Sequence, residues 1–292
     1  MKKIIYPAAI AAGAYFLVQN RQLKIEKYDM ISDKLPAAFE GKKIILLADL
    51  HRKRYGDNFN NLMNSVAALE PDYIFFAGDL FSKNETELMP KYAFMKRLKE
   101  TAPVYYVLGN HEIRNMDNCE ALCLKLKNAG INVLRNEMTR IYEGGSFINV
   151  YGTQLSARYY MNRDGSYKDL PELSCETLEK YLGKAEKNVC NILISHDPFF
   201  LETYARWGAD LVFSGHCHGG VIRLPGVGGI LSPERRLMPK YTKGIYTCGK
   251  TVMALTSGLG KFRLNNPSQI MVCTLSRRRK IKGGSKAWSI SD

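Results

Sequence analysis

The sequence predicts an α/β fold with mixed sheets. Short apolar runs alternate with stretches of helical spacing, which is the pattern of βαβ units. Four of these runs end in a short polar motif that contains histidine, and another ends in Gly78-Asp79. A Gly-Gly turn within residues 143–146, followed by an apolar run, indicates an antiparallel hairpin in the middle of the chain. Parallel and antiparallel strands are therefore expected together.

The first half of the chain is expected to alternate strands and helices. Apolar residues mixed with charges favour a strand at 22–30, and the near-continuous apolar run at 44–47 is typical of a strand buried on both faces. Leu62, Val66 and Leu69 are spaced for one helical face, which Pro71 ends. Strands are next expected at 73–77 and 104–108, with helices at 87–99 and 118–128.

The second half carries more strand signals. Residues 159–174 lack a pattern and are expected to form a long loop, whose Tyr159 and Tyr160 either stack on a base or sugar or form a half-buried aromatic cluster. Cys119 and Cys123 have the spacing of a soft metal pair, but the leucines around them favour core packing. The expected strands are 130–134, 147–151, 190–194, 209–213, 246–255 and 270–275, with a helix at 175–182.

Composition limits the surroundings in which the protein works. The formal net charge of +14 and the pI near 9.4 indicate anionic partners, which include phosphate substrates, a membrane surface or nucleic acid. Seven cysteines form no zinc-finger spacing, and their odd number argues against a complete disulfide framework. A reducing or anaerobic setting is therefore expected.

The motif Gly215-His216-Cys217-His218 is the strongest chemical signal. In an extended segment, residues two apart point the same way, so the two imidazoles project together while Cys217 faces the opposite side. Asp49 and His51 have the same spacing. Because open α/β sheets bind ligands at the carboxyl ends of their strands, the polar clusters at the strand ends are expected to converge on one metal site.

The order of the motifs resembles the calcineurin-like metallophosphoesterases over roughly residues 43–275. The resemblance rests on Asp49/His51, Gly78-Asp79, Gly109-Asn110-His111-Glu112, His196 and Gly215-His216-Cys217-His218. It implies a four-layer α/β/β/α sandwich of metallophosphoesterase type. Residues 218–225 and the apolar N-terminal segment look like the bacterial membrane-associated branch, in which Thr and Gln are commoner than Cys217 and Val221.

The resemblance also implies the activity, which is hydrolysis of a phosphodiester or pyrophosphate bond by attack of a hydroxide that bridges two metal ions. A donor set without thiolate suits divalent manganese, iron or zinc. The substrate would be a phosphate-containing small molecule or lipid. One metal would take Asp49, His51, Asp79 and His218, and the other would take Asp79, Asn110, His196 and His216.

Two catalytic residues are implied by this ligand set. Asp79 bridges the metals, and His111, which is left without a metal, is expected to protonate the leaving group. A direct ligand role is the alternative for His111, and Glu112 or another nearby carboxylate is expected to orient its ring. The arginines Arg52, Arg54 and Arg223 either contact substrate phosphate or are solvated.

Two other functions are compatible with the same sequence. One is a nuclease of the same fold, which the positive charge permits. The other is a non-catalytic phospholipid-binding protein that has kept the fold, although a complete set of motif residues argues against it.

The chain is expected to have three parts, which are an N-terminal hydrophobic membrane anchor at 1–20, a catalytic domain at 21–276 and a basic tail at 277–292. The uncharged run at 4–18 is shorter than the roughly 20 residues of a spanning helix. A cleaved signal peptide is the alternative, because residues 12–14 have the small-x-small form of a cleavage site.

The expected location is the cell membrane, with a single anchor. Lys2 and Lys3 favour an amino end on the inner side, whereas Arg21, Lys24 and Lys27 favour the opposite orientation. Both orientations stay open. The basic tail is either solvated or attracted to anionic lipid.

Overall fold

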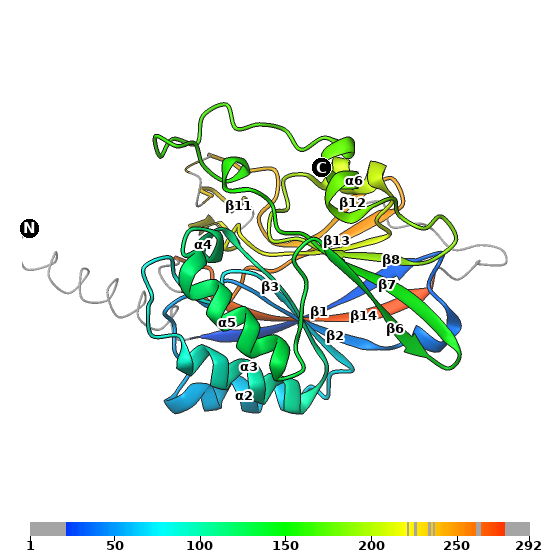
Figure 1. The fold of residues 1–292 in the computed structure, drawn as a ribbon, viewed down its shortest axis with the longest axis horizontal. Coiled ribbons are helices and arrows are strands. Elements are labelled where there is room, and N and C mark those ends of the chain that lie inside the picture. Colours follow the sequence, from blue (N-terminus) through cyan, green and yellow to red (C-terminus); the bar gives the residue numbers. More distant parts are fainter. Residues whose placement is uncertain are drawn as a thin grey trace, which may run out of the picture.

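Two six-stranded mixed sheets form the centre of the fold (Figure 1). The computed structural model of the chain describes residues 22–220, 222–224, 227–232, 235, 237–260 and 264–277. The first sheet has the order β1 (Leu23–Ser32), β14 (Ser268–Arg277), β2 (Lys43–Leu47), β3 (Tyr73–Ala77), β4 (Val104–Val107) and β5 (Asn132–Val133). The second has the order β12 (Gly244–Cys248), β13 (Thr251–Leu255), β9 (Leu211–Ser214), β8 (Asn191–Ile194), β7 (Ser146–Gly152) and β6 (Glu137–Glu143).

Helices cover the outer face of each sheet. On the first sheet lie α2 (Asn60–Ala67), α3 (Met89–Thr101) and α5 (Met116–Asn128), and on the second lie α6 (Cys175–Leu182) and α7 (Leu201–Trp207). Short elements complete the fold: α4 (Asn110–Ile113), the β10 (Arg223–Leu224) and β11 (Gly228–Gly229) pair, and the 3-10 turns Ala37–Phe39, Asp57–Phe59 and Ala157–Tyr159. The layers are α/β/β/α, as the family resemblance implies.

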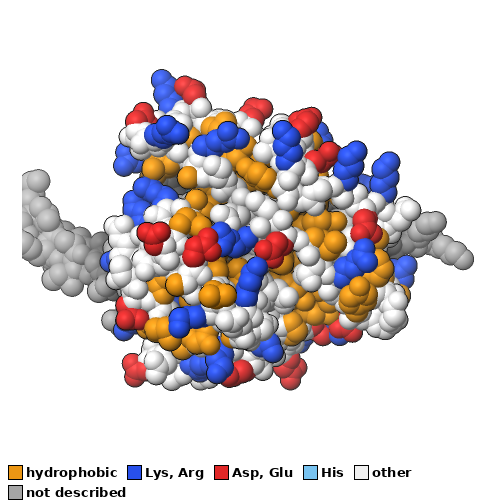
Figure 2. Space-filling model, in the orientation of Figure 1, with side chains coloured by type: hydrophobic (Ala, Val, Ile, Leu, Met, Phe, Trp, Pro, Cys, Tyr) orange, Lys and Arg blue, Asp and Glu red, His pale blue; other side chains and the backbone are white. Residues whose placement is uncertain are grey.

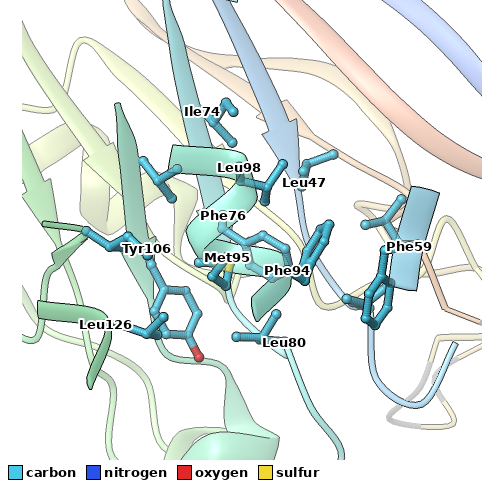
Figure 3. Packing of buried hydrophobic residues seen from close by; sticks show 14 of the residues in the cluster. Leu47, Phe59, Ile74, Phe76, Leu80, Phe94, Met95, Leu98, Tyr106 and Leu126 are labelled. Carbon is cyan, nitrogen blue, oxygen red and sulfur yellow. The ribbon is translucent and has the colours of Figure 1, made fainter. Parts of the chain in front are cut away.

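The alternation of side chains along the strands builds three apolar layers. In β2, Ile44 and Leu46 pack between the sheets, whereas Ile45 and Leu47 pack under the helices. Figure 3 shows the layer under the helices, where side chains of β3 such as Phe76 meet α3. Because a fully buried large apolar side chain contributes about 1.5–3 kcal/mol, these layers supply most of the favourable burial.

The motifs occur at the carboxyl ends of neighbouring strands. In the first sheet β2, β3 and β4 are parallel, and in the second β7, β8, β9 and β13 are parallel. The predicted hairpin in the middle of the chain is confirmed as the antiparallel pair β6 and β7. The two sheets therefore present their strand ends at one edge.

Most predicted elements are present, and three predictions need correction. The single strand expected at 246–255 is a hairpin of β12 and β13, which turns at Gly249 with a φ of +60°. Helices α4 and α7 follow strand ends where no helix was expected. Both are short, with four and seven residues, so they offer too few turns for a clear helical period.

The predicted anchor at 1–20 and residues 278–292 of the basic tail lie outside the described residues. Among the described residues, no helix is both long enough and apolar enough to cross a membrane.

Candidate metal centre

Five loops bring the predicted polar residues together at the shared edge of the two sheets. The loops after β2, β3 and β4 carry Asp49/His51, Asp79 and Asn110/His111. The loops after β8 and β9 carry His196 and His216/His218. All five histidines of the chain therefore lie in these loops.

The first group consists of Asp49, His51, Asp79 and His218, which can each offer one ligand atom within 4.8 Å of the others. The Nε2 atoms of His51 and His218 are 3.2 Å apart. His218 Nε2 lies 3.5 Å from Asp49 Oδ1, and His51 Nε2 lies 3.6 Å from Asp79 Oδ2. Nitrogen and carboxylate atoms that face one another in this way fit the donor set of a divalent cation.

A second group lies on the other side of Asp79. His196 Nε2 is 3.4 Å from Asp79 Oδ2 and 3.2 Å from Asn110 Oδ1. His216 Nδ1 is 3.0 Å from the same Asn110 oxygen. His196 Nδ1 lies 2.6 Å from the carbonyl oxygen of Ala77, to which it donates, so Nε2 faces the site and can bind a cation when the ring is neutral.

The electrostatics of the centre are set by buried carboxylates. Burial alone would raise the pKa of Asp79, but the rings of His196 and His111 hold it well below its ordinary value. Burial would likewise lower the pKa of His196, yet Asp79 and Asp49 raise it to about 10. Negative charge therefore dominates the centre, which favours a bound cation.

Residues of the centre share an unusual backbone conformation, which several other non-glycine residues of the described chain also adopt. Asp49, His51, Asp79, His216 and His218 all have φ between +50° and +71°. L residues other than Asn and Asp rarely adopt this left-handed conformation, and residues held there cost on the order of 1–3 kcal/mol each. The surrounding contacts must hold these side chains in place against the local backbone preference.

Two glycines permit the close packing of the loops. Gly78, at a φ of +86°, would place a Cβ 2.6 Å from His196 Nδ1. Gly258, at a φ of +70°, would place one 2.7 Å from the Cβ of Asp49. Gly78 belongs to a motif, whereas Gly258 follows β13 and no sequence signal identified it.

Glu112 has a different role from the one expected. Its carboxylate accepts hydrogen bonds from the backbone N–H groups of Asp79 (2.9 Å), Leu80 (2.6 Å), Phe81 (3.3 Å) and Gly109 (2.8 Å). Glu112 therefore does not orient the His111 ring, because both of its oxygens bind backbone; the other nearby carboxylate is that of Asp79, 4.0 Å from His111 Nε2. Burial, together with Asp79, raises the pKa of Glu112 to about 7. Glu112 joins the loops that follow β3 and β4.

A backbone contact to Nδ1 orients the ring of His111. The backbone N–H of Lys83 donates to His111 Nδ1 at 3.1 Å, so the neutral ring carries its proton on Nε2. That nitrogen lies 4.0 Å from Asp79 Oδ2, and burial lowers the pKa of the ring. The Nε2–H group of His111 thus points toward the Asp79 carboxylate, which contacts both groups of candidate ligands.

Asn266 also supports the centre and was not predicted. It is almost fully buried, and its Nδ2 donates to the carbonyl oxygens of His218 and Gly220. It fixes the turn that carries His218. No local pattern in the sequence distinguishes this asparagine, because its partners lie more than 40 residues earlier.

The other candidate residues have structural partners. Arg223 donates to the Gly219 carbonyl and to Thr242 Oγ1, and Arg52 donates to the Asn84 carbonyl. Tyr159 and Tyr160 are buried in the apolar layer outside the second sheet, so the buried alternative holds for them. Cys119 and Cys123 are also core residues.

The chain was compared with known proteins. The sequence model of the family described as calcineurin-like phosphoesterase matches residues 42–220. A Campylobacter jejuni protein named as an uncharacterized metallophosphoesterase is 28% identical, with 95% of this chain and 71% of that protein covered. Escherichia coli phosphodiesterase YaeI is 28% identical, with 80% and 82% covered.

A solved structure supports the fold. Phosphopantetheinyl hydrolase from Mycobacterium tuberculosis superposes with a TM-score of 0.50 at 14% identity, with 76% of this chain and 92% of that chain covered.

We predict that Glu112→Gln destabilises the metal-free protein by about 1–3 kcal/mol, because the amide nitrogen would bring N–H donors against backbone N–H donors. Glu120→Gln is the matched control, since Glu120 pairs with Arg135 at the surface and its loss should cost less than about 1 kcal/mol. Denaturant unfolding after chelation measures both. Equal losses in the two variants would contradict the role assigned to Glu112.

Proposed function

Because the chain belongs to the calcineurin-like phosphoesterase family and is a metal-dependent phosphoric ester hydrolase, we propose that it uses two divalent ions bridged by Asp79. The supporting observation is that Asp79 Oδ2 lies 3.6 Å from His51 Nε2 and 3.4 Å from His196 Nε2, which belong to different groups. One ion would take Asp49, His51, Asp79 and His218, and the other would take Asp79, Asn110, His196 and His216.

The donor chemistry fits manganese, iron or zinc. Carboxylate, imidazole and amide donors are present, and the one thiol inside the motifs, Cys217, is packed in the apolar layer outside the second sheet. Two such ions would supply Lewis-acid stabilisation of a phosphoryl oxygen and a nucleophile generated from water.

The protein's own contribution to the reaction is positioning and proton transfer. Hydrolysis of a phosphodiester or pyrophosphate bond needs a proton for the leaving oxygen. His111 can donate this proton from Nε2, because Lys83 holds Nδ1 as an acceptor. Glu112 keeps the loops of Asp79 and His111 at a constant separation through its four backbone contacts.

We expect the purified protein to bind two divalent ions per chain and to lose hydrolysis of bis(p-nitrophenyl) phosphate on chelation. The physical reason is the presence of two donor groups that share one carboxylate. Metal analysis beside activity measures this. Full activity with one ion per chain would contradict the bridged pair.

The roles of His111 and Asp79 are separable by substitution. His111→Ala should keep both ions and lower turnover by about 10²–10⁴, whereas Asp79→Ala should lose metal and activity together. The loss in His111→Ala should be smaller for a nitrophenol leaving group, which needs little protonation, than for an alkyl alcohol. If both variants lose metal to the same extent, His111 is a ligand.

We also propose that residues 1–20 anchor the catalytic domain (21–276) to a membrane, with the basic tail (277–292) near its surface. Burial of large apolar side chains is worth about 1.5–3 kcal/mol each, and a basic residue beside anionic lipid adds about 1 kcal/mol. Salt screens only the second contribution.

Full-length protein should therefore stay with membranes through a high-salt wash. A chain that begins at Leu23, where β1 starts, should be soluble and keep its diesterase activity. Fractionation measures both, and release of the full-length protein by salt alone would contradict the anchor.

A further inference from the structure

A cleft of about 660 Å³ opens beside the second ligand group. Asn110, His111 and His216 form its inner end. Its outer wall belongs to the long loop of residues 153–174 between β7 and α6, which rises above α4 in Figure 1. The volume lies within the range of small-molecule sites in proteins. The cleft therefore has room for the part of a substrate that extends away from the reacting phosphate.

The cleft is strongly positive. Lys83, Arg114, Arg158 and Arg163 line it, and no carboxylate is among its lining residues. Figure 2 shows Lys and Arg side chains, with Asp and Glu side chains between them, along the upper edge of the molecule, where Figure 1 places this loop. Arg158 is engaged, since it lies over the Tyr159 ring and donates to its hydroxyl at 3.0 Å.

The other three cations, Lys83, Arg114 and Arg163, are not paired with carboxylates of the described residues, whereas several basic residues elsewhere in the fold are. Lys34, Lys42 and Lys127, for example, pair with carboxylates. Among the ion pairs of the described residues, none includes Lys83, Arg114 or Arg163. Positive charges gathered without counter-charges in a concave site raise the local concentration of anions.

The cations belong to segments that are held in place. Asn162 Nδ2 donates to Ser166 Oγ at 2.9 Å and to the Lys168 carbonyl at 2.7 Å, which closes the turn that carries Arg163. Arg114 ends the helix that carries Asn110 and His111, and Lys83 contacts His111 through its backbone. The fold therefore fixes the backbone positions from which these cations extend into the cleft.

We propose that this cleft binds a second phosphate group of the substrate, through Lys83, Arg114 and Arg163. The inference rests on the proposed function, which places the reacting phosphate at the metal centre. Guanidinium groups match phosphate oxygens in a bidentate way, and three cations suit a doubly charged group better than a single carboxylate. Met161 and Tyr167, which are partly exposed, line the same cleft and offer apolar surface to the connecting scaffold.

A measurement of nucleotide binding tests this assignment of the cleft and does not require turnover. Manganese-loaded protein should bind adenosine 3′,5′-bisphosphate about tenfold or more tightly than adenosine 5′-monophosphate at physiological salt, as expected for at least one charge-assisted hydrogen bond. The double variant Arg114→Gln/Arg163→Gln should lose this preference, whereas Lys125→Gln, which removes a charge from α5 outside the cleft, should keep it. Calorimetry measures the affinities. Equal affinity for both nucleotides in the unaltered protein would overturn the proposal.

A measurement of hydrolysis distinguishes a failure of this inference from a failure of the proposed function. Two chromogenic diesters share the scissile bond and differ in one phosphate: thymidine 5′-(p-nitrophenyl phosphate) and its 3′-phosphorylated form. We expect a KM about tenfold lower for the 3′-phosphorylated form, with similar kcat, and the double variant should raise only that KM. Hydrolysis of both diesters with the same KM would overturn the cleft assignment and leave the proposed function intact. Hydrolysis of neither would contradict the proposed function, while the nucleotide affinities would still decide on the cleft.

Discussion

The burial of Asp49 and Asp79 among imidazoles is the interaction on which the rest of this structure depends. Two carboxylates at one edge of a protein core are costly unless positive charge compensates them. Both are essentially inaccessible to solvent, and each lies within 4 Å of two or more histidine nitrogens. The need for compensation explains why all the histidines gather at this edge and why the donor set suits divalent cations.

The loops that carry these residues are stabilised by contacts with residues outside the two groups of candidate ligands. Five residues of the centre have left-handed backbone conformations, which the local sequence would not favour. Glu112 supplies four backbone contacts between two loops, and Asn266 fixes the turn of His218. Gly258 leaves the space that Asp49 occupies. The geometry of the metal centre is thus maintained by residues that would not bind a metal.

The same framework places the basic cleft. Lys83 contacts His111 through its backbone, and Arg114 follows directly on the helix of Asn110 and His111. Short segments of the chain therefore connect the candidate metal centre with the basic residues of the cleft. The 153–174 loop belongs to both, because Tyr160 packs against the rings of His196 and His216 while Arg163 lines the cleft.

The sequence by itself determined the strands, the family and the residues that face one another at the strand ends. Those features depend on local patterns, such as the apolar runs before each motif. The extended geometry expected for residues 215–218 is wrong, because His216 and His218 follow β9 in a turn with positive φ and lie in different ligand groups. Only the tertiary structure decided the roles of Glu112, Gly258 and Asn266, because their partners lie on loops distant in the chain. It also decided that residues 246–255 turn at Gly249 and that β1 pairs with β14. The physical reason is that apolar runs and motif residues are local properties of the chain, whereas the conformation of the loops and contact across sheets depend on how separate strands pack.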